Sequence, residues 1–153
     1  MKKVLIAGVT SGSGKTTAVL GILKALNEKY TIQSYKVGPD YVDTKFHTRI
    51  TNRPTRNLDN YLVPDPQVLN YLFTANTENI DLGIIEGVMG LYDGLGTDKD
   101  AYSTASIAKQ LNIPVILVIN ARATSTSAAA ILKGFIDFDK KVPIKGVIIN
   151  NVM

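Results

Sequence analysis

The sequence predicts an α/β fold in which a mainly parallel sheet carries helices on both of its faces. Two observations lead to this prediction. Short apolar runs rich in β-branched residues recur along the 153 residues, and segments of helical character separate them. Runs that are apolar throughout are typical of strands buried on both faces, and strands joined through helices pair in parallel.

The first half of the chain contributes two of the expected strands. Residues 3–8 (KVLIAG) and 31–37 (TIQSYKV) are short and rich in β-branched side chains, and residues 15–30 between them have helical character. Residues 38–63 contain two prolines, many polar side chains and only weak periodicity. We therefore expect this stretch to be a functional loop region with one short helix.

Three more strands and three more helices are expected in the second half. The strands are residues 81–87 (DLGIIEG), 113–120 (IPVILVIN) and 144–152 (IKGVIINNV). The helices are residues 65–76, 103–112 and 125–138, each of which begins at an aspartate or a serine that can cap a helix. The length suits one domain over residues 1–153.

Composition narrows the classes of function. The 17 basic and 13 acidic residues give a net charge of only +4, and the basic residues are scattered, which argues against binding of nucleic acid. The sequence has no cysteine, which excludes a disulfide framework, a thiolate metal site and a thiol nucleophile. The apolar run near the N-terminus breaks at Thr10, too early for a signal peptide or a membrane span, so we expect a cytoplasmic protein.

A glycine-rich segment, AGVTSGSGKTT at residues 7–17, joins the first expected strand to the first expected helix. Its glycines allow backbone N–H groups to turn toward a phosphate, Lys15 can reach the outer phosphates, and the hydroxyl of Thr16 can bind Mg²⁺. The common pattern G-x-x-x-x-G-K-[ST] requires a glycine at Val9, whereas Gly8 stands one residue earlier. We interpret the segment as a variant phosphate-binding loop; the alternative is a glycine-rich turn without a ligand.

Charged side chains follow the second expected strand, in YKVGPDYVDTKFH at residues 35–47. Lys36 lies at the strand end, and Asp40 and Asp43 come after a Gly-Pro turn, so a cation and two carboxylates can converge near the phosphates. The alternative is a solvated loop whose charges have no role. His47 is the only histidine. A lone histidine is usually structural, so we do not expect it to be a catalytic base.

Glu86 ends an apolar strand in LGIIEGVMGLYDG, residues 82–94. A carboxylate without a partner is costly to bury there, and a bound Mg²⁺ would compensate it. In phosphate-loop proteins the carboxylate at the end of a second central strand usually holds the metal directly or through water. The glycines of this block allow close approach of a ligand, and Asp93 can point into the same cleft. A solvated glutamate at a strand end is the alternative.

Six blocks, in this order, resemble the cobyrinic acid a,c-diamide synthase family, of the dethiobiotin-synthetase-like branch of phosphate-loop enzymes. The blocks are AGVTSGSGKTT, YKVGPDYVD, NLDNYL, IIEGVMGLYDG, STASIAKQL and GVIINNV, spread over the whole chain. That branch is similar to this sequence in placing its first glycine one residue early. The resemblance implies a three-layer P-loop NTPase fold.

The same blocks separate this chain from neighbouring families. Partition and cell-division ATPases carry a signature lysine early in the loop, where this chain has Thr10. Cobyric acid synthase typically has a different segment in place of KVGPDYVD, and dethiobiotin synthetase lacks the EGVMGLYDG block. The diamide synthase family is therefore the resemblance that we adopt.

The resemblance implies an ATP- and Mg²⁺-dependent ligase of cobalamin biosynthesis. Its reaction would be amidation of the a and c carboxylates of cobyrinic acid, or of a related tetrapyrrole such as hydrogenobyrinic acid or nickel sirohydrochlorin, through an acyl phosphate. Nitrogen would come from ammonia supplied by a glutaminase domain or subunit outside this chain. A homodimer is the assembly that we consider.

The resemblance also implies a role for each candidate residue. Lys15, Lys36 and Asp93 are expected to be catalytic, with Lys36 stabilising the transferring phosphoryl group. The residues expected around Mg²⁺ are Thr16, Asp43 and Glu86, and those expected at the substrate are Asp40 and Tyr41. The residues expected to bind the nucleotide are Gly12, Ser13, Gly14, Lys15, Thr16, Thr17 and Asn150. The Asn150 amide would read the adenine edge; the alternative is a polar residue leaving a strand.

Two features depart from the family. The strand at residues 113–120 commonly ends in aspartate in the family, whereas Asn120 stands here. The family's full chains continue into further strands and a glutaminase domain with a cysteine nucleophile, neither of which these 153 residues contain. We therefore expect an incomplete amidoligase domain. Three alternatives stay open: a regulatory nucleotide-binding module, a carboxylate ligase of the dethiobiotin type, and an inactive fragment.

Overall fold

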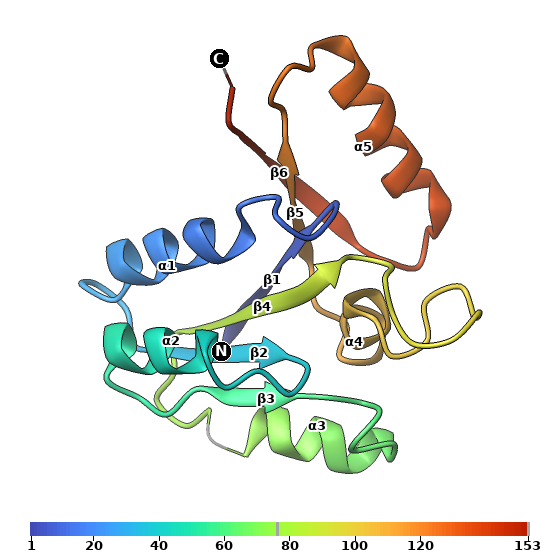
Figure 1. The fold of residues 1–153 in the computed structure, drawn as a ribbon. Helices are drawn as coiled ribbons and strands as arrows, with labels where there is room; N and C mark the ends of the chain where they lie inside the picture. Colours follow the sequence, from blue (N-terminus) through green and yellow to red (C-terminus); the bar gives the residue numbers. More distant parts are fainter. Residues whose placement is uncertain (76, 153) are drawn as a thin grey trace.

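The protein is described by a computed structural model that covers residues 1–75 and 77–152. Over these residues the chain forms a six-stranded sheet in the order β3-β2-β4-β1-β5-β6, and each neighbouring pair is parallel (Figure 1). The strands are β1 (Lys2–Gly8), β2 (Ile32–Val37), β3 (Arg56–Leu58), β4 (Leu82–Gly90), β5 (Val115–Asn120) and β6 (Ile144–Asn150). The helices are α1 (Lys15–Leu26), α2 (Asp43–Thr51), α3 (Pro66–Thr74), α4 (Thr104–Gln110) and α5 (Thr126–Phe138).

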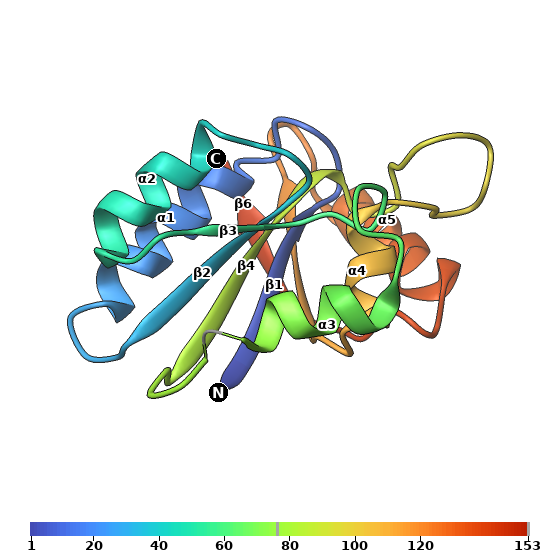
Figure 2. The ribbon, with the colours of Figure 1, turned by 90° about the horizontal axis from the view of Figure 1, so that it is seen from below.

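Helices cover both faces of the sheet and divide its core in two (Figures 1 and 2). On one face, Val19 and Leu23 of α1 pack with strand side chains such as Ile6, and α2 lies beside α1. On the other face, α3, α4 and α5 enclose a larger cluster that contains Phe73 and Ile107. Because successive residues of a strand point to opposite faces, each central strand contributes to both clusters.

The predicted α/β fold class is confirmed, and all five predicted strands are present. The sheet is parallel at every described pair of neighbouring strands, and the short helix expected within residues 38–63 is α2. The sixth strand, β3, falls in the same stretch and was not expected. It has three residues, of which only Leu58 is buried, so it shows no apolar run.

Several boundaries differ from the expected ones. α1 ends at Leu26, where residues 27–30 continue as a turn closed by hydrogen bonds to Leu26 O, instead of reaching residue 30. β4 continues three residues past Gly87 to Gly90, and β6 ends at Asn150. The predicted helix over residues 65–76 corresponds to α3, and residue 76 itself lies outside the described residues.

Side chains cap two of the helices that begin at an expected capping residue. Asp65 accepts hydrogen bonds from the backbone N–H groups of Gln67 and Val68, and Ser103 accepts one from Ser106 N. Ser125 precedes α5 without such a bond. None of the helices in the described part of the chain combines the length and the apolar character that crossing a membrane requires.

Candidate functional site

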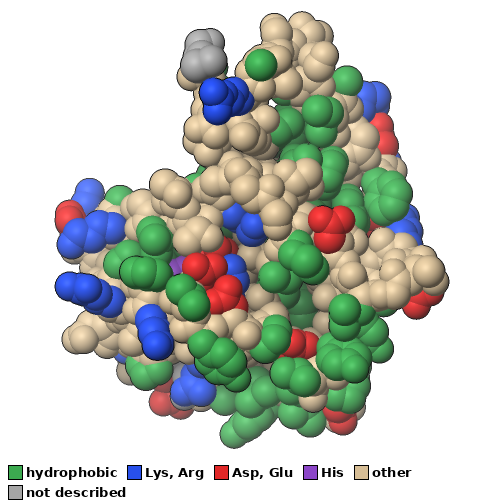
Figure 3. Space-filling model, viewed as in Figure 1, with side chains coloured by type: hydrophobic (Ala, Val, Ile, Leu, Met, Phe, Trp, Pro, Cys, Tyr) green, Lys and Arg blue, Asp and Glu red, His purple; other side chains and the backbone are tan. Residues whose placement is uncertain are grey.

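The glycine-rich segment and the ends of β2 and β4 meet at the carboxyl edge of the sheet. β4 lies between β1 and β2, and Glu86 is in register with Ile6 on one side and with Lys36 on the other. The three groups of candidate residues therefore converge, as a parallel topology requires. In the space-filling view, acidic, basic and histidine side chains meet on this face between apolar ones (Figure 3).

The backbone of the glycine-rich segment is held in a tight turn. The buried Ser13 hydroxyl donates to Thr10 O at 2.7 Å and accepts from Thr10 N at 3.0 Å. Gly12 and Gly14 have φ angles of 76° and 89°, the left-handed region that favours glycine. α1 then begins without a capping side chain or an acidic residue in its first turn, so its free N–H groups can bind an anion.

The position of the early glycine has a steric explanation. A Cβ at Gly8 would lie 2.8 Å from Thr10 O and 3.3 Å from the Nζ atom of Lys15. The lysine side chain thus folds back close over residue 8, and any larger residue there would displace the turn or the lysine. Val9, in contrast, is partly buried against the larger core cluster.

Lys15 is a buried cation without a carboxylate partner. Its relative exposure is 8%, and among the described residues no carboxylate oxygen lies within 4.0 Å of Nζ. Burial and the charge of Lys36 lower the pKa of the Lys15 ammonium, and the more distant carboxylates of Glu86 and Asp43 offset this only in part. A phosphate bound at the loop would supply the missing negative charge.

Glu86 is fully buried, and both of its carboxylate oxygens have partners. Oε1 accepts from the Thr16 hydroxyl at 2.6 Å and from Lys36 Nζ at 3.0 Å, and Oε2 lies 2.7 Å from His47 Nε2. Burial raises the pKa of the Glu86 carboxyl, but the His47 hydrogen bond, the Lys36 charge and the Thr16 hydroxyl together lower it to about 2. Protein side chains thus already compensate the Glu86 charge in the absence of a metal.

Lys36 is the centre of the polar cluster. Its ammonium donates to Asp43 Oδ2 at 2.8 Å, to Glu86 Oε1 at 3.0 Å and to Gly87 O at 3.2 Å, and Asp40 Oδ2 lies 3.9 Å away. Burial lowers the pKa of Lys36, and the two close carboxylates outweigh burial and raise it. We call Thr16, Lys36, Asp43, His47 and Glu86 the polar cluster.

His47 is the member of the polar cluster that sequence reasoning left out. It is fully buried on α2, one helical turn after Asp43, and its Nδ1 atom has no hydrogen-bond partner. The spacing of Asp43 and His47 by four residues is the signal that would have placed both on one face of a helix. That signal was missed because the surrounding stretch is polar and only weakly periodic.

The residues expected at the substrate, Asp40 and Tyr41, lie at the start of α2, and the expected catalytic residue Asp93 lies after the end of β4. Asp40 Oδ1 accepts from the backbone N–H groups of Val42 and Asp43 at 2.8 and 3.0 Å, which fixes the first turn of α2. Tyr41 is 74% exposed beside it. Asp93 is exposed and accepts from Gly90 N at 3.0 Å, and no hydrogen bond between described residues joins it to the polar cluster.

Two residues expected at the nucleotide have distinct environments. Asn150 at the end of β6 donates from Nδ2 to Ser13 O at 3.1 Å and packs directly over Gly14, so it contacts the phosphate loop. Thr17 is exposed on the first turn of α1. The structure therefore brings Lys15, Thr16 and Asn150 together around one loop, with Thr17 on its outer side.

The oxygen atoms near the loop suit Mg²⁺ only as part of a nucleotide complex. Thr16 and Glu86 provide a hydroxyl and a carboxylate 2.6 Å apart, which are the hard donors that Mg²⁺ prefers. Within residues 1–75 and 77–152, no three His, Cys, Asp or Glu side chains are grouped as metal ligands. The donor set fits an ion that takes most of its ligands from phosphate and water.

Two adjoining hollows lie beside the polar cluster. One has a volume of about 330 Å³ and extends toward Tyr61, Leu62 and Tyr102; the other, of about 440 Å³, extends toward Asp40 and Tyr41. Both share a floor made by Val37, Gly38, Pro39 and Val88. We call the two hollows together the apolar groove.

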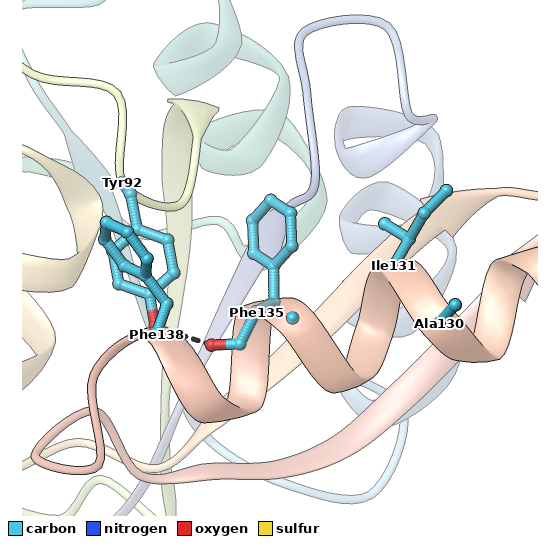
Figure 4. A pocket seen from close by; sticks show the side chains of 6 residues that line it. Tyr92, Ala130, Ile131, Phe135 and Phe138 are labelled. Atoms are coloured by element: carbon cyan, nitrogen blue, oxygen red, sulfur yellow. Dashed lines mark hydrogen bonds between the residues drawn. The ribbon is translucent and has the colours of Figure 1, made fainter.

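A third hollow is remote from the polar cluster. It has a volume of about 440 Å³ and lies along α5, where Tyr92, Phe135 and Phe138 line it and the Tyr92 hydroxyl donates to Phe135 O at 2.8 Å (Figure 4). Burial and the nearby carboxylates of Asp139 and Asp100 raise the pKa of Tyr92 to about 12. No charged side chain lines this hollow, so it offers nothing to a phosphate.

Comparison with known proteins agrees with this geometry. A family model described as the CobQ/CobB/MinD/ParA nucleotide binding domain matches residues 4–153. The chain is 56% identical over 153 residues to the cobyrinate a,c-diamide synthase of Streptococcus sanguinis (strain SK36) and 49% identical over 152 residues to that of Methanococcus maripaludis (strain C5). Each alignment covers 99% of this chain and 34% of the relative, so the chain spans about a third of the length of these relatives.

Solved structures share the fold. Chloroplast FtsY from Physcomitrella patens superposes with a TM-score of 0.57 at 14% identity, over 97% of this chain and 49% of that chain. The hydrogenase maturation factor HypB from Archaeoglobus fulgidus superposes with a TM-score of 0.51 at 16% identity, over 97% of this chain and 80% of that chain. At these identities the likeness shows the fold alone.

Proposed function

The chain belongs to the CobQ/CobB/MinD/ParA nucleotide-binding family, and we propose that it is the ATP-binding part of a ligase that amidates the a and c carboxylates of cobyrinic acid or a related tetrapyrrole. Its similarity to cobyrinate a,c-diamide synthases supports the substrate. The observation that carries the chemistry is the placement of Lys36 between two carboxylates, next to a phosphate loop whose own lysine has no carboxylate partner.

The proposed reaction has two steps. A substrate carboxylate oxygen attacks the γ-phosphorus of ATP, the bond to ADP breaks, and an acyl phosphate forms. Ammonia then attacks the acyl carbon, and inorganic phosphate leaves with the bonding electrons while nitrogen loses a proton, which yields the amide. The first step joins two anions, so it depends mainly on charge neutralisation and alignment.

Different residues around the loop would bind the phosphates, stabilise the transferring phosphoryl group and hold Mg²⁺. Lys15 and the backbone N–H groups at the start of α1 would bind the phosphates, with Asn150 supporting the loop and contributing to the nucleotide site. Lys36, held by Asp43 and Glu86, would stabilise the phosphoryl group as it transfers. Mg²⁺ bound with ATP would neutralise phosphate charge, held by Thr16 together with Glu86 and Asp43.

The remaining candidates lie toward the substrate. Asp40 and Tyr41 border the apolar groove, where they would orient the substrate carboxylate. Asp93, exposed after β4, would direct the incoming ammonia. We propose that the ammonia is released by a glutaminase domain or subunit beyond these residues, since the chain has no cysteine to act as the glutaminase nucleophile. A homodimer is the proposed assembly.

The test is ATP turnover with Mg²⁺ and ammonia, in the presence and absence of cobyrinic acid, followed by the mass of the corrinoid. We expect cobyrinic acid to stimulate turnover and to become its diamide. Lys15→Ala is expected to abolish ATP binding, whereas Lys24→Ala, exposed on the same helix, is expected to leave it unchanged. The proposal would be contradicted if cobyrinic acid changed neither the rate of ATP turnover nor its own mass. Normal ATP binding by Lys15→Ala would contradict it as well.

A further inference from the structure

The turn after β3 is built to expose apolar side chains. It spans residues 59–62 and completes the NLDNYL block, whose first two residues belong to β3. Asp59 Oδ1 accepts from the backbone N–H groups of Tyr61 and Leu62, and Asn60 Nδ2 donates to the Ser106 hydroxyl of α4. The Asp59 bonds fix the shape of the turn and the Asn60 bond anchors it to α4, yet Tyr61 is 58% exposed and Leu62 is 64% exposed.

The hollow that Tyr61 and Leu62 line is also lined by two residues with a strained backbone. Met89 and Tyr102 have φ angles of 47° and 59°, a region that bulky residues rarely occupy because it costs about 1 kcal/mol or more. Both side chains line the hollow and remain more than 40% exposed. Burial of these side chains therefore does not offset the free-energy cost of the backbone strain. The Tyr61 and Tyr102 rings meet edge to face, with centroids 5.2 Å apart.

The hollow connects with the reaction site at the carboxyl edge of the sheet. Its floor residues Val37 and Val88 pack with the larger core cluster, on the face opposite Lys36 and Glu86. The connection is Asp40, which lines the second hollow and whose Oδ2 atom lies 3.9 Å from Lys36 Nζ. The floor continues into the second hollow at Asp40 and Tyr41. The apolar groove therefore passes the polar cluster with aromatic side chains at both ends, and its volume is in the range of sites that bind small molecules.

We propose that the apolar groove binds the macrocycle of the tetrapyrrole, with Tyr61 and Tyr102 against its apolar face and its edge carboxylates directed to Lys36. This inference rests on the proposed function. A tetrapyrrole has broad apolar faces and carboxylates on its periphery, which matches a groove with apolar walls that leads, at Asp40, toward the buried Lys36. The NLDNYL block is then a substrate-binding element, and the strain at Met89 and Tyr102 presents their side chains to the ligand.

The test is the affinity for cobyrinic acid, measured by titration calorimetry on the longest form of the protein that its gene encodes, with ATP affinity measured alongside. Tyr61→Ala and Tyr102→Gly are expected to weaken cobyrinic acid binding about tenfold or more while leaving ATP affinity unchanged. Tyr71→Ala is the matched control, because Tyr71 is 67% exposed on α3 and lies outside the groove. Tyr102→Gly also relieves the positive φ, so its melting temperature should not fall.

The outcomes separate the inference from the function on which it rests. If the unaltered protein binds cobyrinic acid and both groove variants bind it equally well, the groove assignment is overturned and the proposed function stands. If the unaltered protein binds ATP but no cobyrinic acid, the proposed substrate is overturned together with the inference.

Discussion

At the scale of single residues, the polar cluster is organised around one buried carboxylate. Glu86 has no exposure to solvent, and three donors from three different elements satisfy it: Thr16 of α1, Lys36 of β2 and His47 of α2. A buried carboxylate is tolerated only when such partners are present. The three donors therefore stabilise the folded state. Through Glu86, Thr16 and His47 also help to hold Lys36 in position.

The substitution His47→Ala tests whether the donors to Glu86 stabilise the fold, because it removes the partner of one carboxylate oxygen, Oε2. The change removes the only side chain within hydrogen-bond distance of Glu86 Oε2 among the described residues, and it should lower the free energy of unfolding by about 2–4 kcal/mol. The measurement is urea denaturation monitored by circular dichroism.

Two further variants are the controls. Phe46→Ala, at an exposed neighbour on the same helix, should change stability by less than about 1 kcal/mol. His47→Gln, whose side chain can still donate a hydrogen bond to Glu86, should recover part of the stability that His47→Ala loses. Equal stability of His47→Ala and Phe46→Ala would contradict the role of His47.

At the scale of elements, the phosphate loop and β6 support each other. A Cβ at Gly14 would collide with the Asn150 amide, whereas a Cβ at Gly12 would meet no atom within 4 Å. Both positions have positive φ, so an alanine is strained at either one. The loop is therefore constrained at Gly14 by the last strand of the sheet, which lies far from it in the sequence.

The contact between Gly14 and Asn150 predicts that two similar substitutions lower the free energy of unfolding by different amounts. Gly12→Ala should lower the free energy of unfolding by about 1 kcal/mol, from backbone strain alone, and Gly14→Ala should cost about 1–2 kcal/mol more. Adding Asn150→Ala should recover part of the loss for Gly14→Ala and none for Gly12→Ala, in a double-mutant cycle followed by thermal unfolding. Additive effects in both cycles would show that Asn150 does not constrain the loop.

A second element-scale contact joins β2 to α3. The hydroxyl of the fully buried Tyr35 donates to Phe73 O at 2.7 Å, and burial raises its pKa from 10.0 to about 12. A group whose pKa is raised by folding contributes stability below its unfolded pKa and loses it as pH rises through the folded value. Between pH 10 and 12 the contribution of Tyr35 should thus fall by about 2–3 kcal/mol.

The difference in unfolding free energy between the wild type and Tyr35→Phe separates the titration of Tyr35 from the titration of the other tyrosines and the lysines. At pH 9 the variant should be less stable than the wild type by about 1 kcal/mol, the value of the lost hydrogen bond. By pH 12 the difference should vanish or reverse. Urea denaturation across this range gives both curves, and Tyr71→Phe, exposed on the same helix as Phe73, should follow the wild type throughout. A gap that stays constant with pH would refute the assignment.

The elements also show which features a sequence can predict. Most of the strands were predictable because they are short and rich in apolar, β-branched residues, as in β1, β4 and β5. The convergence of Lys36 and Glu86 followed from their places at the ends of parallel strands. β3 and the role of His47 were not, because they depend on contacts across the sheet within a polar stretch. The partners of Asp93 and Asn150 are set by backbone geometry in turns, which residue types alone do not specify.

At the scale of the whole molecule, the β6 edge of the sheet exposes apolar side chains. β6 is an edge strand on which Val147 and Ile149 are 38% and 55% exposed. α5, whose described side chains include only one buried residue, also exposes Ile131 and Phe138. A long apolar edge strand with free backbone groups is a template for pairing with another chain.

The 153-residue chain should consequently self-associate through this edge. Sedimentation velocity at increasing protein concentration should show a mass that rises above that of the monomer. Ile149→Lys should suppress the rise, because a charged side chain on an edge strand opposes pairing and costs little stability at a half-exposed position. Tyr30→Lys, 45% exposed in the turn after α1, should leave association unchanged. A wild-type chain that stays monomeric, or association that Ile149→Lys does not reduce, would contradict pairing through the β6 edge.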